Sequence, residues 1–394
     1  MGGKAVLAFS GGLDTSVVAR MLQDRGMDVV TVTVDVGQGG DYRRVAAKSR
    51  RLGAVKHRHI DARAEFATRY VIPAIKANAL YQGKYCLATA LARPLIAVKL
   101  LEVARKEGAK ALAHGCSGKG NDQVRFDNAL RAGGKLPIIA PIRELDLDRP
   151  AELEYAAEHG IAIDKVAKRY SIDQNLWGRA IEGGDLEDPY SEPRDDAFAW
   201  VRTRNLPAKP TYIVVRFERG VPVAVDGKRM RPADLVAYMN KKAGAAGVGI
   251  VDHIEDRVVG IKSREVYETP GALCLIEAHA DLEKMVHTSH QSRFKRSADA
   301  EWAQLAYTGL WDDPLREDLD SLIESSQSAV TGDVRLRLLQ GGMRVVGRRS
   351  PRSLYSRKAA TYGPGSTFDQ RLARGFVELW GMQSAEAARL RDRR

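Results

Sequence analysis

Apolar and polar positions follow one another over residues 5–160 in a pattern typical of alternating strands and helices. Residues 5–9 form a short apolar run bounded by glycines, and residues 28–35 form a second run rich in valine and threonine. Such runs predict buried strands. Between them, apolar side chains recur at helical spacing from residue 14 until Gly26, which can cap a helix. The order strand, helix, strand predicts a right-handed unit with a parallel sheet.

The same alternation continues to residue 160. Further strands are predicted at residues 55–61, 110–114 and 136–141, and helices at residues 87–107 and 148–160. Pro94 lies inside the longer helical pattern, where it removes one backbone hydrogen bond, so we expect that helix to kink or restart. The first part of the chain therefore predicts an α/β domain with a mainly parallel sheet.

The pattern changes in the second part of the chain. Residues 170–193 are polar, contain several glycines and prolines and show weak periodicity, which indicates a linker or lid. Hairpins are predicted at residues 212–225 and 334–346, the second turning at Gly341-Gly342, and helices at residues 233–242 and 272–289. Hairpins combined with helices predict an antiparallel α+β domain.

The last stretch, residues 367–390, has an amphipathic helical pattern. Its apolar stripe consists of Phe368, Leu372, Phe376, Leu379 and Trp380. A terminal helix beyond the last domain has to bury such a stripe, and we expect a neighbouring subunit to cover it.

Length and charge restrict the class of protein. A chain of 394 residues is too long for one small core and suggests two domains. The formal net charge of +12 is compatible with a basic surface, an anionic small molecule or a nucleic acid. The basic residues are spread along the chain without a dense cluster or interleaved aromatic residues, so we expect no nucleic-acid partner.

Cysteine usage and hydropathy indicate the compartment. Cys86, Cys116 and Cys274 show no C-x-x-C spacing and no paired histidine motif, which argues against a zinc site and a disulfide framework. No apolar run approaches the roughly 18 residues that a membrane-spanning helix needs. The first strand begins almost at the N-terminus, so we expect no signal peptide. These features predict a cytoplasmic protein without a membrane partner.

The segment between the first strand and the first helix reads SGGLDTS, from Ser10 to Ser16. A glycine turn before a helix directs backbone N–H groups to the positive end of the helix dipole, which suits a phosphate group. No lysine follows the glycines as in a Walker A loop, and the adjacent Gly11 and Gly12 do not match the dinucleotide pattern. An ordinary turn with capping hydroxyls is the alternative. The segment resembles the PP-loop of the N-type ATP pyrophosphatases, which cleave ATP between its α and β phosphates.

Two other glycine-rich segments also follow predicted strands. One is VGQGG at residues 36–40, and Val34 just before it can contact an adenine through its backbone, although a flexible turn explains the glycines equally well. The other is HGCSGKGNDQVRF at residues 114–126, which is too polar for a core element. Because parallel strands end at one edge of the sheet, these segments and SGGLDTS are expected to form one site.

Three polar residues lie between the second and third of these segments in the chain. Tyr85, Thr89 and Arg93 are spaced four residues apart, so on a helix they share one face. That face either binds a polar amino acid or belongs to an ordinary amphipathic helix.

Together these motifs resemble those of the argininosuccinate synthase family. The motifs that carry the resemblance are SGGLDTS, VGQ, LARP, HGCSGKGNDQVRF, NLWGR, EDRVVGIKSREVYETPG and GRRSPRSLY, in the order found in the family. The resemblance implies a PP-loop domain of the adenine nucleotide alpha hydrolase-like fold at residues 1–166. It further implies a synthetase domain at residues 167–362, an oligomerisation helix at residues 363–394 and a homotetramer.

The family joins L-citrulline to L-aspartate in arginine biosynthesis, using ATP, forming citrullyl-AMP and releasing AMP and pyrophosphate. The resemblance implies ATP as cofactor, with Mg²⁺ carried by ATP and no assigned protein ligand. The residues that match ATP contacts are Ala8, Phe9, Ser10, Gly11, Gly12, Leu13, Asp14, Thr15, Ser16, Val34 and Gly115. The residues assigned to citrulline are Tyr85, Thr89, Ala90, Asn121, Arg125, Ser171, Ala180, Glu255 and Tyr267. The residues assigned to aspartate are Arg93, Ser117, Asn121 and Asp122.

Asp14 and Asp122 are the carboxylates assigned to catalysis. Asp122 is the candidate for receiving the proton of the aspartate amine, and the alternative is that it only positions the substrate ammonium. Glu255 and Tyr267 belong to the second domain, so the resemblance implies a site in the cleft between the domains.

The chain departs from the common family pattern at three contact positions. Ala90 and Ala180 stand where many members have serine, and Ser117 replaces a more usual threonine. A lost hydroxyl costs roughly 0.5–1.5 kcal/mol, which lowers affinity without changing the reaction. The alternatives are a different ureido substrate, a tRNA thiolase and a nucleotide-binding regulator without activity.

Overall fold

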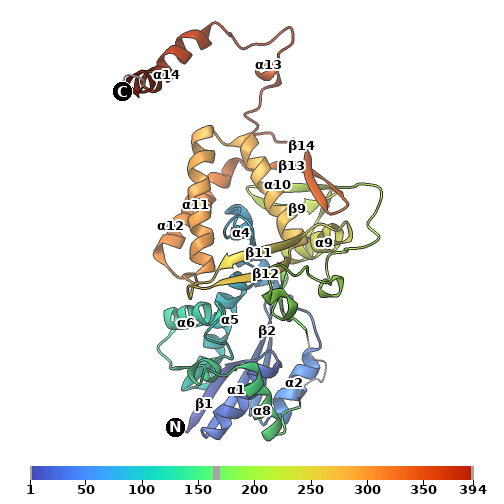
Figure 1. The fold of residues 1–394 in the computed structure, drawn as a ribbon, viewed down its shortest axis with the longest axis vertical. Helices are drawn as coiled ribbons and strands as arrows, with labels where there is room; N and C mark the ends of the chain where they lie inside the picture. The colour runs from blue at the N-terminus through green and yellow to red at the C-terminus, as the bar shows by residue number, and fades with distance from the viewer. Residues whose placement is uncertain (1, 163–168, 392–394) are drawn as a thin grey trace.

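The computed structural model describes residues 2–162 and 169–391. Figure 1 shows the N-terminal domain at the bottom, a second domain above it, and the C-terminal helix extending from the top. The expected domain boundary between residues 166 and 167 lies outside the described residues.

The first domain contains a five-stranded parallel sheet in the order β3-β2-β1-β4-β5. Its strands are β1 (Gly3–Ala8), β2 (Met27–Asp35), β3 (Lys56–Asp61), β4 (Ala111–Ala113) and β5 (Ile138–Ile139). Every strand predicted here is present, with ends shifted by up to two residues. Since β1 lies beside β4, the loops that follow these two strands meet where the strand order reverses, the usual ligand-binding place of such sheets.

Helices cover both faces of this sheet. The longer ones are α1 (Leu13–Asp24), α2 (Tyr42–Arg51), α5 (Ala88–Glu107), α6 (Asp122–Gly133) and α8 (Arg149–Glu158). Val6 belongs to the hydrophobic cluster of α5, whereas Ala5 and Leu7 belong to that of α1, as the alternation of side chains along a strand requires. Pro94 lies within one continuous α5, so the predicted restart of the helix is wrong.

A short segment of the first half reaches into the second domain. It comprises α3 (Arg63–Phe66), a π-helical turn (Ala67–Val71) and α4 (Ile72–Lys76). Figure 1 shows α4 between the helices of the upper domain, where it packs against α10 (Pro270–Val286) and α12 (Pro314–Ser326). One hydrophobic cluster therefore runs through both domains.

The segment predicted as a linker or lid instead forms part of a sheet. β6 (Ser171–Gln174) and β7 (Arg179–Glu182) pair as a hairpin. This hairpin belongs to a four-stranded antiparallel sheet in the order β11-β12-β7-β6. The other strands are β11 (Ile250–Asp256) and β12 (Lys262–Glu268). The strands of this hairpin are short and rich in polar residues, so they lack the apolar alternation by which strands are predicted.

The remaining sheet has five strands in the order β10-β9-β8-β13-β14. It contains the two predicted hairpins, formed by β8 (Thr211–Glu218) with β9 (Val221–Val225) and by β13 (Gly332–Leu339) with β14 (Gly342–Arg349), and the short strand β10 (Lys228–Arg229). The second turn lies at Gln340-Gly341, one residue earlier than predicted, because both residues adopt the positive φ of 47° and 81° that a tight hairpin turn needs.

Helices α9 (Pro232–Ala245) and α10 match the two predicted in this domain, but α10 ends at Val286. Thr288 caps the next helix, α11 (Ser289–Tyr307), which was not predicted from the sequence. Antiparallel sheets combined with these helices confirm the α+β class.

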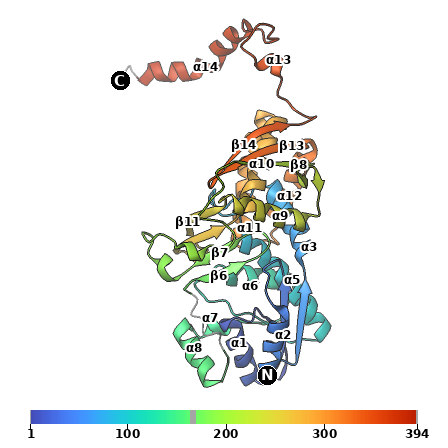
Figure 2. The same ribbon diagram turned by 90° about the vertical axis from the view of Figure 1, so that its right-hand side faces the viewer.

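The C-terminal helix, α14 (Leu372–Arg391), follows the short α13 (Arg357–Ala360) and has no buried residue. Figure 2 shows it extending away from the body of the chain. Its apolar side chains are exposed, with Leu372 at 74% and Trp380 at 79%. The chain thus leaves this stripe uncovered. Within the described residues, no helix is long and apolar enough to cross a membrane.

Candidate active site

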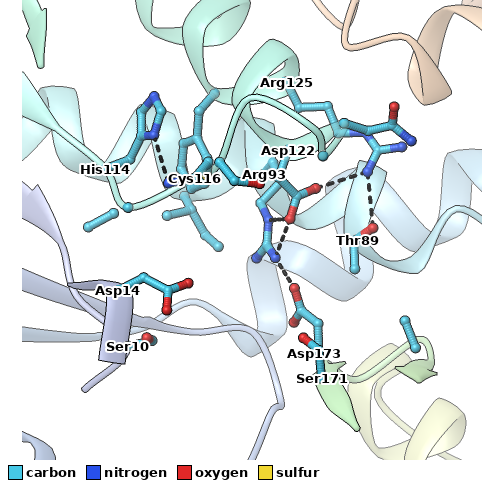
Figure 3. A pocket seen from close by; sticks show the side chains of 18 of the residues that line it. Ser10, Asp14, Thr89, Arg93, His114, Cys116, Asp122, Arg125, Ser171 and Asp173 are labelled. Carbon is cyan, nitrogen blue, oxygen red and sulfur yellow. Dashed lines mark hydrogen bonds and ion pairs between the residues drawn. The ribbon is translucent and has the colours of Figure 1, made fainter. Parts of the chain in front are cut away.

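A cavity of about 560 Å³ lies between the two domains. Its lower wall comes from the loops after β1, β2 and β4, and its upper wall comes from β6, β7, β11 and β12. Figure 3 shows side chains of both domains pointing into it. The three predicted loops therefore meet at one edge of the sheet and line one cavity.

The loop from Ser10 to Ser16 is stabilised by its own hydroxyls. The Ser10 Oγ accepts a hydrogen bond from the Gly12 N–H and lies 3.2 Å from the Thr15 Oγ1, and the Ser16 hydroxyl donates to the Gly12 carbonyl at 2.5 Å. Gly11 adopts φ +80°, which favours glycine. The chain thus turns directly into α1 and leaves the first N–H groups of that helix without helical partners.

Lys48 is a contact of this loop that sequence reasoning missed. Its Nζ donates to the Gly11 carbonyl at 2.7 Å, from the face of α2. A lysine that follows the glycines directly marks a Walker A loop, but here the lysine comes from another helix, so no local pattern identifies it.

The loop after β4 packs directly onto the loop after β1. A Cβ on Gly115 would lie 3.2 Å from the backbone of Asp14 and Thr15, which explains the glycine. His114 supports the loop from behind, since its Nε2 lies 2.9 Å from Asp127 and its Nδ1 accepts from the Cys116 N–H. These contacts bring the two predicted segments together.

The turn after β2 is held by a glutamine side chain. The Gln38 Nε2 donates to the Val34 carbonyl at 2.8 Å, and its Oε1 accepts from the Val36 N–H at 2.7 Å. Gln174 of β6 donates to the Gln38 carbonyl and ties the turn to the second domain. The glycines of this turn therefore belong to an ordered structure.

Two arginines converge on Asp122 at the start of α6 (Figure 3). The Arg93 Nε donates to this carboxylate at 2.8 Å, and the Arg125 guanidinium donates at 2.9 Å. Burial alone would raise the pKa of Asp122, but the two guanidiniums outweigh it and lower the pKa below the ordinary value. Arg93 also forms an ion pair with Asp173 of the second domain. Asp122 is thus a carboxylate at neutral pH.

Tyr85 does not belong to the helix that the spacing suggested. Leu87 has a φ of +66°, and α5 begins only after it, at Ala88. The Tyr85 hydroxyl nevertheless accepts from the Thr89 N–H at 2.8 Å and lies 2.7 Å from the Thr89 Oγ1, which in turn accepts from Arg125. Tyr85 and Thr89 are therefore in contact as predicted, but a turn brings them together and not a shared helix face.

Residues from both domains meet in a hydrogen-bonded group around Glu255. The carboxylate accepts from the hydroxyls of Tyr267 at 2.6 Å and Tyr307 at 2.7 Å, and Tyr307 accepts from the Asn121 amide at 2.8 Å. Burial, followed by the charge of Glu255, raises the pKa of both tyrosines, which stay protonated donors. Tyr307 lies in α11 and belongs to no recognised motif.

A second acidic group lines the upper wall and was also missed. Arg257 donates to Glu182 at 2.6 Å and to Glu265 at 2.9 Å, and its Nη1 donates to the carbonyl of Lys119 in the loop after β4. Burial, then the charge of Glu182, raises the pKa of Glu265 to about 9. The polar alternation in the unpredicted strands β7 and β12 is the signal that could have indicated these residues.

Glu152 of α8 adds an acidic side chain beside the phosphate loop. It lines the cavity although only 6% of it is exposed. Burial, then the neighbouring Asp14 carboxylate, raises the pKa of Glu152 to about 8. Sequence reasoning treated α8 only as a helix and did not single out this residue.

The predicted contact residues fall into two sets. Those lining the cavity are Ala8, Phe9, Ser10, Asp14, Thr15, Val34, Tyr85, Thr89, Arg93, Gly115, Ser117, Asn121, Asp122, Arg125, Ser171, Ala180, Glu255 and Tyr267. Those beside it without lining it are Gly11, Gly12, Leu13, Ser16 and Ala90. Of the two alanines that replace serine, Ala180 lines the cavity, whereas Ala90 is buried and does not.

Neither a disulfide nor a metal cluster is found in the described part of the chain. Cys86, Cys116 and Cys274 are free, and burial raises the pKa of each thiol. No group of three or more His, Cys, Asp or Glu side chains is arranged to hold a metal ion among these residues.

Comparisons with known proteins agree with this architecture. Residues 4–162 match the model of the arginosuccinate synthase N-terminal HUP domain, and residues 170–387 match that of the arginosuccinate synthase C-terminal domain. The argininosuccinate synthase of Pyrococcus furiosus is 53% identical over 98% of this chain and 94% of its own. That of Hyperthermus butylicus is 52% identical over 99% of both chains.

One solved structure resembles part of the chain. A 4-thiouridine synthetase in complex with RNA and bound ATP aligns with 40% of this chain and 41% of its own, at 20% identity and a TM-score of 0.31. A likeness this low supports no conclusion. The two family models and the full-length relatives together show that the chain belongs to the argininosuccinate synthase family.

Proposed function

We propose that this chain condenses L-citrulline with L-aspartate to argininosuccinate in two steps within the interdomain cavity, at the expense of ATP. The observation that carries the proposal is the meeting, in one cavity, of the SGGLDTS loop, the Arg93–Asp122–Arg125 group and the Glu255–Tyr267 pair. The first feature suits a pyrophosphate, and the other two suit the charged groups of amino acids.

In the first step, the ureido oxygen of citrulline attacks the α-phosphorus of ATP and pyrophosphate leaves. The N–H groups and hydroxyls of the Ser10–Ser16 loop stabilise the charge on the departing pyrophosphate. Val34 and Gly115 line the adenosine end. Because donors fixed in the loop need no reorganisation, they lower the barrier more than water does.

Citrulline lies between the upper wall and the first turns of α5 and α6 in this proposal. The polar groups that face it come from Tyr85, Thr89, Asn121, Arg125, Ser171, Glu255 and Tyr267. The apolar side chain of Ala180 also lines this part of the cavity. Glu255, which accepts hydrogen bonds from the hydroxyls of Tyr267 and Tyr307, lines the cavity as an acceptor for an ammonium group. The Tyr85 ring stacks on Tyr267 at 4.3 Å between centroids and gives the wall a fixed shape.

In the second step, the amine of aspartate attacks the activated carbon and AMP leaves. Arg93 and Ser117 bind the carboxylates of aspartate, while Asn121 and Asp122 face its amine. Asp122 accepts the proton that the amine loses. Holding both reactants beside the adenylate converts a bimolecular reaction into an intramolecular one.

The nucleotide binds as its magnesium complex. Mg²⁺ prefers one or two carboxylates together with phosphate oxygens and water. Asp14 and Glu152 beside the phosphate loop fit that donor set, since Glu152 is buried with one oxygen lacking a hydrogen-bond partner. The ion, when bound, neutralises part of the pyrophosphate charge.

The reaction is tested by measuring pyrophosphate release from Mg-ATP with citrulline and aspartate supplied singly and together. We expect release to depend on citrulline, and full turnover with AMP formation to require aspartate as well. Activity only with another ureido compound or with tRNA contradicts the substrate assignment. ATP binding without any turnover contradicts the assignment as an enzyme.

Asp122→Asn separates the two steps. Since its lowered pKa keeps Asp122 ionised at neutral pH, the variant removes a charged acceptor throughout the neutral range. We expect kcat for argininosuccinate formation to fall at least about a hundredfold, as for loss of a general base. Citrulline-dependent exchange of pyrophosphate into ATP should change by about twofold or less. A raised KM for aspartate with unchanged kcat would instead assign Asp122 a positioning role only.

Ala180→Ser tests whether the missing hydroxyl weakens citrulline binding. Ala180 lines the cavity, so serine adds a hydrogen-bond donor there, and we expect KM for citrulline to fall by up to about tenfold with kcat little changed. Ala90→Ser is the matched control, because Ala90 is buried and does not line the cavity. Equal effects of both substitutions contradict the proposed citrulline position.

We also propose that α14 joins copies of the chain into a homotetramer. The exposed stripe of Leu372, Phe376 and Trp380 supports this, since apolar patches of this kind are covered in assemblies. A chain ending at Tyr362 should have a smaller mass in multi-angle light scattering than the full chain, and Trp380→Asp in the full chain should act in the same direction. An unchanged mass in both contradicts the proposal.

A further inference from the structure

One side chain behind the cavity, that of Tyr307, contacts residues of both domains. Tyr307 is the last residue of α11, and it is buried without lining the cavity. Its hydroxyl accepts a hydrogen bond from the Asn121 amide at 2.8 Å and donates to the Glu255 carboxylate at 2.7 Å. Asn121 and Glu255 both line the cavity. The hydroxyl therefore links a residue of the loop after β4 to a residue of β11.

Further contacts fix the ring and the backbone of Tyr307. The ring stacks on that of Tyr81, with 3.4 Å between the centroids and 5° between the planes. The Tyr307 carbonyl accepts from the Arg125 Nε at 3.0 Å, and the guanidinium carbon of Arg125 lies over the ring, 5.0 Å from its centroid. In the turn after α11, a Cβ on Gly309 would lie only 2.8 Å from the Arg125 Cα. The end of α11 is thus packed directly on the first turn of α6.

The orientation of two wall residues depends on the Tyr307 hydroxyl. The Asn121 amide is held at both ends, because its Oδ1 accepts from the Val258 N–H at 2.9 Å and its Nδ2 donates to Tyr307. Glu255 is buried, and its two carboxylate oxygens accept from Tyr267 and Tyr307. Tyr267 lines the cavity, whereas Tyr307 does not. Tyr307 can therefore act on a substrate only through its neighbours.

We propose that Tyr307 is a positioning residue whose hydroxyl holds Glu255 and Asn121 in the arrangement that binds citrulline, a role that rests on the proposed binding of citrulline in the cavity. A hydrogen bond to a carboxylate is strong in surroundings of low polarity, and its donor limits rotation of the carboxyl group. Ordering both side chains before citrulline arrives removes an entropy cost from binding. Because this contribution is equal in the ground state and the transition state, it acts on KM and not on kcat.

The chain offers a matched pair of substitutions, Tyr307→Phe and Tyr81→Phe. Each removes one hydroxyl and keeps the stacked ring. The Tyr81 hydroxyl donates to the Asp256 carbonyl at 2.9 Å, and the same carbonyl lies 3.0 Å from the Tyr307 hydroxyl. Tyr81→Phe therefore changes the contacts of Asp256 without removing a hydrogen bond to Glu255 or Asn121. KM and kcat are measured for citrulline, aspartate and Mg-ATP from the release of pyrophosphate.

We expect Tyr307→Phe to raise KM for citrulline at least about tenfold, because it removes a hydrogen bond to a buried charged group. KM for aspartate should rise less, since only Asn121 serves that substrate as well. KM for ATP and kcat should change by about twofold or less, as should every constant of Tyr81→Phe. Equal effects of the two substitutions, or a lower kcat without a higher KM for citrulline, overturn the positioning role.

A double-mutant cycle tests whether the hydroxyl acts through Glu255. In a Glu255→Ala background, Tyr307→Phe should raise KM for citrulline by about threefold or less, because the partner is already absent. A further tenfold rise there overturns the proposal, since the hydroxyl then acts elsewhere. Failure of Tyr307→Phe to fold, where Tyr81→Phe folds, assigns the hydroxyl a structural role and has the same consequence. If the unmodified protein shows no citrulline-dependent release of pyrophosphate, the proposed function fails and the positioning role fails with it.

Discussion

The close approach of two loops at the carboxyl ends of β1 and β4 is the constraint on which the site depends. Gly115 fits against the backbone of Asp14 and Thr15 because it has no Cβ, and a Cβ there would lie 3.2 Å from that backbone and require it to shift by a few tenths of an ångström. The parallel order that places β1 beside β4 brings these loops together. Everything proposed for the nucleotide, including the cation on Asp14, requires this contact.

The second domain completes the cavity through polar contacts with those loops. Asn121 donates to Tyr307 and accepts from the Val258 N–H, and Arg93 pairs with Asp173, so both walls share hydrogen-bonded partners. Such contacts are stronger in surroundings of low polarity than in water. They therefore hold the two walls of the cavity in place relative to one another.

Much of the first domain was predictable from sequence because its strands are apolar and its turns contain glycine. The strands β6, β7, β11 and β12 were not, since residues that line a polar cavity replace the apolar alternation on which prediction relies. Asn121 and Tyr307 are 186 residues apart, and no local spacing reveals such a pair. The proximity of Tyr85 and Thr89 was predicted correctly. They are joined by a turn in which Leu87 has a left-handed backbone conformation, and not by a continuous helix.

The charge of the cavity differs from that of the chain. The formal net charge is +12, yet the cavity lining contains seven acidic side chains, Asp14, Asp122, Glu152, Asp173, Glu182, Glu255 and Glu265, against three arginines, Arg93, Arg125 and Arg257. The raised pKa values of Glu152 and Glu265, about 8 and about 9, leave these two acids largely protonated at neutral pH. The acids that remain charged oppose a polyanionic nucleotide unless cations and fixed N–H groups intervene, and they favour the ammonium groups of two amino acids.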